Sequence, residues 1–206
     1  MPDLRAVFFD LDGVLIDSKE AWFRLVNGAA RHFCKPDVSR DRFDAGWGQG
    51  IDADLRQFFP GCDAGEVERF YVTHLLDFDT FLHVQPGARD TLYRLRDAEL
   101  LRGVVTNTPT PLARDLLAWA GLIGLVDLTA GPAPARASKP APDIILFACR
   151  ELAVEPRRVL VVGDSHFDAE AAKAARTQFL GFRTPEEPAL QALDELPARI
   201  GVRPRR

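Results

Sequence analysis

The sequence predicts an α/β protein: a doubly wound parallel sheet covered by helices, with a helical domain inserted near its start. Short β-branched runs recur along the chain and alternate with amphipathic segments, which is the pattern of strands and their covering helices. Between residues 17 and 83 this alternation stops, because helical periodicity continues there without a good strand. A chain of 206 residues has room for one full-sized core and a small second domain.

The expected strands are short apolar runs that finish in small or acidic residues, as buried parallel strands do. They are RAVFFD at 5–10, LLRGVVTN at 100–107, RVLVVGD at 158–164 and, more weakly, TQFLGF at 177–182. The helices expected around them repeat apolar residues three and four positions apart, at 88–99, 111–121, 142–153 and 168–178. The stretch 131–143 is rich in proline and alanine, so we expect an irregular loop there.

The inserted segment contains three amphipathic stretches, at 18–33, 52–59 and 64–79. An unstructured loop of this length would be unusual inside a compact domain. We therefore expect residues 1–16 and 84–206 to form the core and residues 17–83 to form the inserted helical domain. The connections at 13–18 and 80–87 are the expected hinges between them.

The composition excludes several classes of partner. With 47% hydrophobic and 27% charged residues and a mean hydropathy of -0.09, the chain has the composition of a soluble globular protein. Its net charge of -4 and pI near 5.6 give no general attraction to nucleic acid or to an anionic membrane, so neither is expected as a partner. The longest uncharged apolar run, 116–126, is too short to span a bilayer.

The cysteines and the chain ends favour a cytoplasmic protein. Cys34, Cys62 and Cys149 are far apart and show neither disulfide nor metal-ligand spacing, which fits a reducing compartment. Acidic residues interrupt the start of the chain, so a cleaved secretion signal is not expected. The basic end, 202–206, is expected to be a frayed terminus. We expect a monomer or a small homo-oligomer.

Polar residues gather where the expected strands end, and in open α/β sheets ligands bind beyond the carboxyl ends of the strands. Asp10 and Asp12 end the first strand, and Asp164 follows the third one after the turn at Gly163. Thr106 and Asn107 end the second strand, where they can offer a hydroxyl and backbone amides to an anion. Lys139 lies in the loop before the helix that is expected near Pro142.

The spacing of Asp10 and Asp12 predicts a metal site. Carboxylates at i and i+2 of an extended segment point to the same side, so each raises the pKa of the other unless a cation lies between them. With Asp164 arriving from another strand, the expected cation is a hard divalent ion, most plausibly Mg²⁺. Such an ion would attract a phosphate, which one carboxylate could attack while a second acted as general acid and base.

Each of these residues also has a purely structural interpretation. Asp12 and Gly13 could form a simple turn, and Thr106 and Asn107 could cap the next helix, although Thr110 before Pro111 is a better expected cap. Asp168 fits a capping box with Ser165. Lys139 could be a surface lysine, but only four of the 26 basic residues are lysines, which makes its place in a rigid loop noteworthy. We expect the remaining candidates to be helix or core residues, namely His32, His166, Trp22 and Phe23.

Taken together, these stretches resemble the four motifs of the haloacid dehalogenase-like hydrolases. The similar segments are DLDGV at 10–14, VVTN at 104–107, SKPAP at 138–142 and VVGDSHFD at 161–168. They occur in the family's order and cover nearly the whole chain. The resemblance implies a Rossmann-like core under a mobile helical cap, with a magnesium-dependent mechanism that proceeds through a phosphoaspartate on a small phosphorylated metabolite.

The resemblance also implies a role for each first-motif and fourth-motif acid. Asp10 would be the nucleophile and a metal ligand, and Asp12 the general acid and base that also binds the metal through its backbone carbonyl. Asp164 would ligate Mg²⁺ and Asp168 would support the metal site. The true dehalogenases of the family lack the second motif-one aspartate and use no magnesium, so Asp12 favours phosphoryl transfer.

The resemblance assigns the phosphate-binding residues as well. Thr106 and Asn107 would hold the transferring phosphoryl group, beside Gly13, and Lys139 would bridge that group to Asp10. One departure from the family concerns Arg176, which stands where relatives usually have glycine. A left-handed cap costs a non-glycine residue ~1 kcal/mol, so we expect the fourth-motif helix to end differently there.

The choice of substrate is expected to depend on the inserted cap. GWGQG at 46–50 resembles the cap loop of phosphoglycolate phosphatases, where glycines let the backbone approach a small substrate. An ordinary turn between helices is the alternative. A phosphoglycolate-like phosphomonoester is therefore the expected substrate, and a β-phosphoglucomutase-type sugar-phosphate mutase is the alternative activity. A non-catalytic binding or regulatory protein on the same fold is the alternative of another class.

Overall fold

The computed structural model describes residues 3–133, 136–184 and 188–202. Over these ranges a six-stranded parallel sheet forms the core, in the order β5-β4-β1-β6-β7-β8. Its strands are β1 (Ala6–Phe9), β4 (Leu101–Val105), β5 (Leu128–Ala130), β6 (Val159–Gly163), β7 (Gln178–Phe182) and β8 (Ala189–Leu190). The central strand β1 pairs with β4 on one side and β6 on the other, so their carboxyl ends lie side by side. This is the doubly wound α/β core that the sequence predicts.

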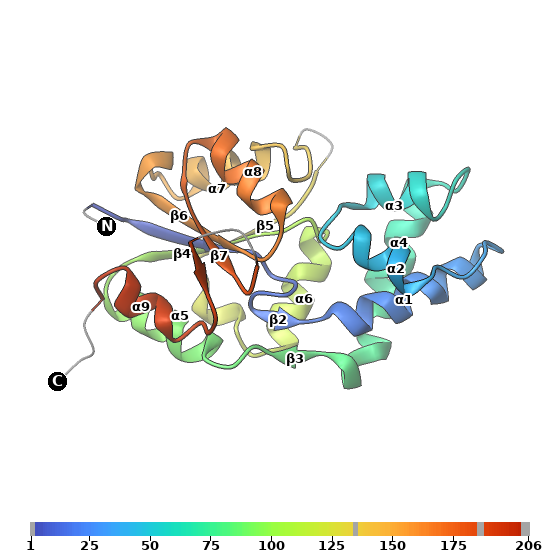
Figure 1. Ribbon diagram of the computed structural model, residues 1–206, viewed down its shortest axis with the longest axis horizontal. Helices are drawn as coiled ribbons and strands as arrows, with labels where there is room; N and C mark the ends of the chain where they lie inside the picture. The colour runs from blue at the N-terminus through green and yellow to red at the C-terminus, as the bar shows by residue number, and fades with distance from the viewer. Residues whose placement is uncertain (1–2, 134–135, 185–187, 203–206) are drawn as a thin grey trace.

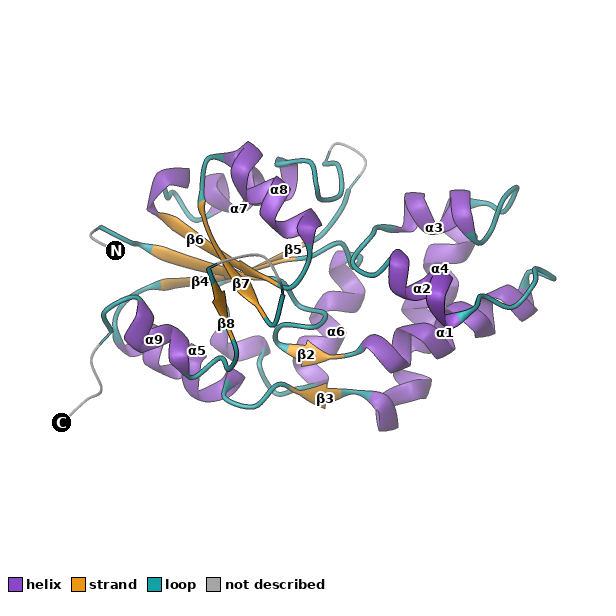
Figure 2. Ribbon diagram, in the orientation of Figure 1, coloured by secondary structure: helices purple, strands orange, loops and turns teal. Residues whose placement is uncertain are grey.

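Helices cover both faces of the sheet, as Figure 2 shows. They are α5 (Ala88–Asp97), α6 (Thr110–Trp119), α7 (Asp143–Glu151), α8 (His166–Ala175) and α9 (Glu195–Arg199). Apolar residues of α5, α6 and α9 pack with Val7 and Phe9 of β1, whereas those of α7 and α8 pack with Ala6 and Phe8. Because successive side chains of a strand point to opposite faces, a continuous apolar run such as β1 serves both layers.

The inserted segment is helical, as predicted, and stands at one end of the sheet as a cap (Figure 1). Its elements are α1 (Lys19–His32), α2 (Arg40–Ala45), α3 (Ile51–Gln57), α4 (Ala64–His74) and the 3₁₀ helix η1 (Leu75–Phe81). The sequence did not predict α2, which is short and is capped by the Ser39 hydroxyl. The pattern at 64–79 was expected to be one helix, but it divides into α4 and η1.

Two short antiparallel strands join the cap to the core. β2 (Ile16–Asp17) pairs with β3 (His83–Val84), so the chain enters and leaves the cap along one ladder. Gln85 adds to this connection, since its backbone N–H donates to the Leu15 carbonyl at 3.0 Å and its Nε2 to the Gly13 carbonyl at 3.0 Å. The position of this ladder supports the proposed domain limits, which are 1–16 and 84–206 for the core and 17–83 for the cap. It also supports the proposed hinges at 13–18 and 80–87.

Two sequence expectations about helix ends are wrong. Arg176 does adopt the left-handed cap conformation, at φ 59° and ψ 36°, because its N–H and that of Thr177 both reach carbonyls of the last turn of α8. Thr110 is the first residue of α6 rather than its cap, and Pro109 precedes it. The Thr110 hydroxyl instead accepts from the Gly131 N–H at 2.9 Å, which fastens the start of the 131–143 loop.

Other expectations concern loops and ends. The described part of the 131–143 stretch contains neither helix nor regular strand before α7, as predicted, although residues 134–135 lie outside the described ranges. Of the basic end, residues 203–206 lie outside them as well. The short elements β5, β8, η2 (Ile123–Leu125) and η3 (Pro156–Arg158) were not predicted. No helix in the described ranges is long and apolar enough to cross a membrane.

Candidate active site

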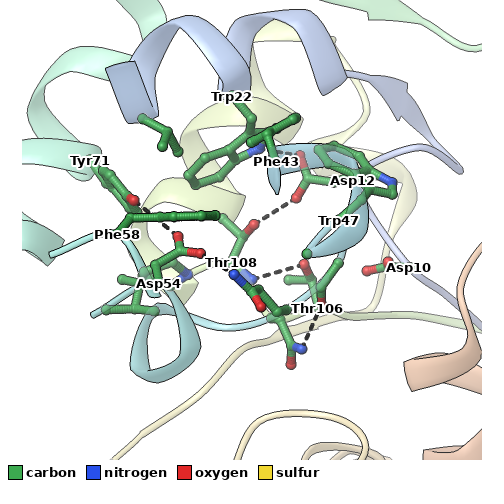
Figure 3. A pocket seen from close by; sticks show the side chains of 17 residues that line it. Asp10, Asp12, Trp22, Phe43, Trp47, Asp54, Phe58, Tyr71, Thr106 and Thr108 are labelled. Atoms are coloured by element: carbon green, nitrogen blue, oxygen red, sulfur yellow. Dashed lines mark hydrogen bonds between the residues drawn. The ribbon is translucent and has the colours of Figure 1, made fainter. Parts of the chain in front are cut away.

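The predicted residues of β1, β4 and β6 meet at the carboxyl edge of the sheet, under the cap. A pocket of about 580 Å³, its open mouth included, lies between cap and core. Core residues at its base include Asp10, Asp12 and Thr106, and the cap contributes aromatic side chains (Figure 3). Its size falls within the range of small-molecule sites.

Asp10 lies at the base of this pocket and is only 4% exposed. Its Oδ1 accepts from the Leu11 N–H at 2.8 Å and lies 2.9 Å from Lys139 Nζ. Burial raises the pKa of Asp10 well above its ordinary value of 3.8, Lys139 opposes that rise, and the neighbouring carboxylates add to it. The second oxygen of Asp10 has no such partner among the described residues, so it is the one available to a ligand.

Lys139 is buried rather than a surface lysine, at 3% exposure. Its Nζ lies 2.9 Å from Asp10 Oδ1 and 2.6 Å from Asp168 Oδ1, and it also donates to the Val105 carbonyl at 3.1 Å. Burial by itself would lower the pKa of Lys139, but the attraction of the two carboxylates outweighs it and raises the pKa, so the ammonium stays charged. A fixed cation thus stands beside the candidate nucleophile.

Asn107 positions the Lys139 loop. Its Oδ1 accepts from the Lys139 N–H at 2.7 Å and its Nδ2 donates to the Lys139 carbonyl at 3.0 Å. The same Nδ2 donates to the Gly48 carbonyl of the cap at 2.9 Å. Thr106, 1% exposed, accepts from the Thr108 N–H at 3.1 Å, which leaves its own hydroxyl proton available to a ligand.

The carboxylates fit a divalent cation. One oxygen from each of Asp10, Asp164 and Asp168 lies within 4.8 Å of the others. Asp164 Oδ1 is buried without a hydrogen-bond partner among the described residues, which is the lone-pair donor that a hard cation would use. Burial, and then the charge of Asp168, raises the pKa of Asp164 to about 7, although the Trp47 hydrogen bond and Lys139 oppose the rise, so negative charge is crowded at this site.

Gly13 and Asp168 shape this cluster. A Cβ at Gly13 would stand 2.0 Å from Asp164 Oδ2, and Gly13 has φ of +84°, so the turn after Asp12 has room only for glycine. Asp168 forms the predicted capping box, because its Oδ2 accepts from the Ser165 N–H and hydroxyl. Its Oδ1 accepts from Lys139 Nζ at 2.6 Å, so Asp168 also orients that lysine.

Asp12 is held by three donors that the sequence did not assign to the site. Its Oδ1 accepts from the Ser18 hydroxyl at 2.5 Å and Trp22 Nε1 at 2.7 Å, and its Oδ2 from the Thr108 hydroxyl at 2.6 Å. Trp22 lies on α1 and packs against the core, as expected, and in addition its indole N–H reaches Asp12. Asp12 is more than the turn residue that its glycine neighbour allowed, because its carboxylate faces the pocket (Figure 3).

The GWGQG loop docks the cap on the core. Trp47 Nε1 donates to Asp164 Oδ2 at 3.1 Å, and a Cβ at Gly50 would stand 2.6 Å from the Ser138 hydroxyl. Gly48 has φ of +85° and offers its carbonyl to Asn107. The loop also contacts the core, since Gly48 and Gly50 let its backbone approach core side chains such as those of Ser165 and Ser138.

The cap side of the pocket carries one further acid that the sequence did not single out. Asp54, on α3, is 9% exposed, with Gln49 Nε2 donating to its Oδ1 at 2.7 Å and the Tyr71 hydroxyl to its Oδ2 at 2.9 Å. Burial raises the pKa of Asp54 to about 6 against the two hydrogen bonds. Its position on an amphipathic helix gave no signal, because helical periodicity does not separate a pocket wall from a core.

Comparison with known proteins agrees with this geometry. A family model described as haloacid dehalogenase-like hydrolase matches residues 4–176. A phosphoglycolate phosphatase of Chromobacterium violaceum is 32% identical over 184 residues, covering 84% of this chain and 82% of that protein. An N-acetylmuramic acid 6-phosphate phosphatase of Pseudomonas putida is 29% identical over 185 residues, covering 87% of this chain and 83% of that protein.

A solved structure shares the fold over nearly the whole chain. CbbY of Rhodobacter sphaeroides, in complex with phosphate, superposes with a TM-score of 0.81 at 24% identity, covering 94% of this chain and 96% of that one. At that identity the likeness concerns the architecture, namely the sheet and the helical cap.

Proposed function

The chain belongs to the haloacid dehalogenase-like hydrolases, among the phosphoric monoester hydrolases, and from this premise we propose that it is a magnesium-dependent phosphatase of a small phosphomonoester. The reaction proceeds through an aspartyl-phosphate on Asp10. One observation carries the proposal: the buried Asp10 carboxylate lies 2.9 Å from Lys139 Nζ, in a cluster with Asp164, whose Oδ1 has no partner among the described residues.

Asp10 and Asp164 would hold Mg²⁺, with the Asp12 carbonyl as a further donor and Asp168 in support. When bound, the ion neutralises charge on the phosphoryl oxygens and on the crowded carboxylates. The Thr106 hydroxyl and the Asn107 backbone N–H hold the phosphoryl group in place, and Gly13, whose own N–H donates to the Ile16 carbonyl at 2.7 Å, leaves room for Asp164 beside them. Lys139 offsets the charge of both Asp10 and that group, which allows two anions to approach.

The chemistry divides between the two first-motif acids. The free Asp10 oxygen attacks phosphorus, a P–O bond to the acyl oxygen forms, and the bond to the substrate alcohol breaks. Asp12 gives its proton to the departing alkoxide, then takes a proton from the water that attacks the phosphoaspartate, which releases phosphate and restores Asp10. The donors on Asp12 keep its carboxylate facing the pocket in both half-reactions.

The cap closes the site during this sequence. Trp47 and Gly48 contact core residues beside the carboxylates, so closure excludes bulk water from the reacting groups. The β2–β3 ladder is the proposed hinge. We also propose that the enzyme works in the cytoplasm, as a monomer or small homo-oligomer, in agreement with free cysteines at 34, 62 and 149.

The relatives carry different substrate names, phosphoglycolate in one case and N-acetylmuramic acid 6-phosphate in the other. Phosphoglycolate and similar compounds are therefore the first substrates to test, and other small phosphomonoesters should be tested with them. The test is phosphate release with Mg²⁺ from small phosphomonoesters, comparing the wild type with Asp10→Asn. Activity that is lost in the variant supports the proposal, and a panel without turnover by the wild type contradicts it.

A further inference from the structure

The cap half of the pocket is acidic and aromatic and contains no basic residue. The lining residues are Asp10, Asp12, Trp22, Val26, Phe43, Gly46, Trp47, Gly48, Gln49, Ile51, Asp54, Phe58, Tyr71, Thr106, Asn107, Thr108 and Pro109. Lys139 stands close behind the phosphate end. At the cap end Lys19 and Arg42 lie 5.6 Å and 5.5 Å from the ring centroids of Trp47 and Phe58, but neither lines the pocket, so among the described lining residues no cation faces a second anionic group. Figure 3 places Asp54 and Tyr71 on the side of the pocket away from Asp10.

Asp54 is the charged group of that wall. Gln49 and Tyr71 each donate one hydrogen bond, to different oxygens, and a carboxylate can accept about four. Among the described residues no basic side chain pairs with Asp54. A buried carboxylate usually pairs with a cation or fills its acceptor sites, so the remaining sites suit donors that arrive with a ligand.

A structural role alone does not explain why position 54 carries a carboxylate. Asp54 accepts hydrogen bonds from Gln49 of the GWGQG loop and from Tyr71 of α4, and these bonds could serve only to hold parts of the cap together. An amide would accept one of these two hydrogen bonds, from Tyr71 or from Gln49, without the cost of a buried charge. The carboxylate also lines the pocket instead of lying behind it, which a structural role does not require.

We propose that the cap selects phosphomonoesters whose alcohol carries a further hydroxyl, donated to Asp54, and rejects alcohols that carry a carboxylate. The substrate class is then a polyol or sugar phosphate rather than phosphoglycolate. Aromatic side chains around Asp54, among them Trp22, Phe43 and Phe58, suit the C–H surface of such a carbon chain. This inference rests on the proposed phosphatase activity and makes it more specific.

Matched substrate pairs test it with the full-length enzyme. 2-Hydroxyethyl phosphate and phosphoglycolate differ by a hydroxymethyl group against a carboxylate, and erythritol 4-phosphate and 4-phosphoerythronate repeat that difference on a longer chain. One of these pairs has the chain length that brings its variable group to Asp54. For that pair we expect kcat/KM of the hydroxyl compound to exceed that of the acid by roughly tenfold or more. Phosphoethanolamine adds an ammonium arm, and its preference over both polyols would overturn the hydroxyl assignment.

Asp54→Asn identifies the residue responsible. The variant keeps the shape of the wall but removes its charge, so the ratio between the two members of a pair should fall by roughly tenfold. Because each ratio compares two substrates of one protein, general damage to the cap cancels from it, and kcat/KM for propyl phosphate, which bears neither group, records that damage separately. Asp52→Asn, an exposed neighbour on α3, is the matched control and should leave every ratio unchanged.

A second variant covers the case in which Asp54→Asn folds poorly. Tyr71→Phe removes one donor but leaves the carboxylate, so it should retain the preference for hydroxyl compounds. The inference is overturned if the wild type turns over phosphoglycolate and 4-phosphoerythronate as well as their hydroxyl partners, or if Tyr71→Phe loses the preference. Absence of turnover on every compound would instead contradict the phosphatase proposal itself.

Discussion

Trp47 Nε1 of the cap donates a hydrogen bond of 3.1 Å to Oδ2 of Asp164, a core residue 117 positions later in the chain. The bond joins the docking loop to one of the carboxylates that would hold the metal. Closure of the cap and completion of the acidic cluster therefore share one residue. A change in this loop would therefore act directly on a carboxylate of the proposed metal site.

Trp47→Phe should weaken cap closure without unfolding the protein. The ring is kept and the N–H is lost, and a hydrogen bond to a carboxylate contributes about 1.5–3 kcal/mol, so we expect kcat/KM to fall by roughly tenfold to a hundredfold. Steady-state kinetics checks this, with a thermal melt to confirm the fold. Trp119→Phe, at an exposed tryptophan of α6, is the control, and equal kinetics of the two variants would contradict the role of Trp47.

Lys139→Met should destabilise the fold as well as abolish activity. The substitution leaves Asp10 and Asp168 buried without their cation, and breaking a buried ion pair from one side costs about 3–5 kcal/mol. Urea unfolding measures the loss. Lys173→Met, on the exposed face of α8, should change the free energy of unfolding little. If the two variants unfold alike, Lys139 does not stabilise the cluster as described.

Magnesium should stabilise the folded chain through Asp164. A ligand that binds only the folded state raises the melting temperature, here by roughly 3 °C or more at saturation. Asp164→Asn should lose most of that increase, because its unpartnered Oδ1 is the expected ligand. Asp115→Asn, an exposed acid of α6, should keep it. An equal increase in all three proteins would place the binding elsewhere.

Asp54 should give the stability a distinctive pH dependence. Its pKa is raised from 3.8 to about 6 in the folded chain, so folding takes up a proton between these values and the free energy of unfolding falls as the pH rises through them. Relative to Asp54→Asn, the wild type should lose about 3 kcal/mol across this window. Urea titrations at several pH values test this, and parallel curves for the two proteins would contradict it.

Local sequence features were enough to predict the core of the site. Asp10, Thr106 and Asp164 each follow a strand that is recognisable from its own residues, and adjacent parallel strands bring such ends together. The contacts that hold Asp12 could not be predicted in this way. Thr108 reaches Asp12 across 96 positions and Trp22 reaches it from a helix whose periodicity only marks a buried face. Asp54 could not be predicted for the same reason, because it also lies on an amphipathic helix.

The left-handed residue at the end of α8 shows a second limit. Propensity argues against Arg176 at that position, yet the two hydrogen bonds of the cap motif outweigh a cost of ~1 kcal/mol. Local preference is a weak guide wherever a short motif satisfies several backbone groups at once. The strands and their polar ends were predictable because burial and topology agree with local preference there.

The measurement that tests the central claim most directly is chemical trapping of the phosphorylated residue. Enzyme mixed with a hydrolysed phosphomonoester and Mg²⁺ is quenched rapidly and treated with borohydride, which reduces an acyl phosphate to the alcohol, and the peptide containing residue 10 is examined by mass spectrometry. The account predicts homoserine at position 10, dependent on substrate and absent from Asp10→Asn. Reduction at another residue, or continued turnover by Asp10→Asn, would contradict it.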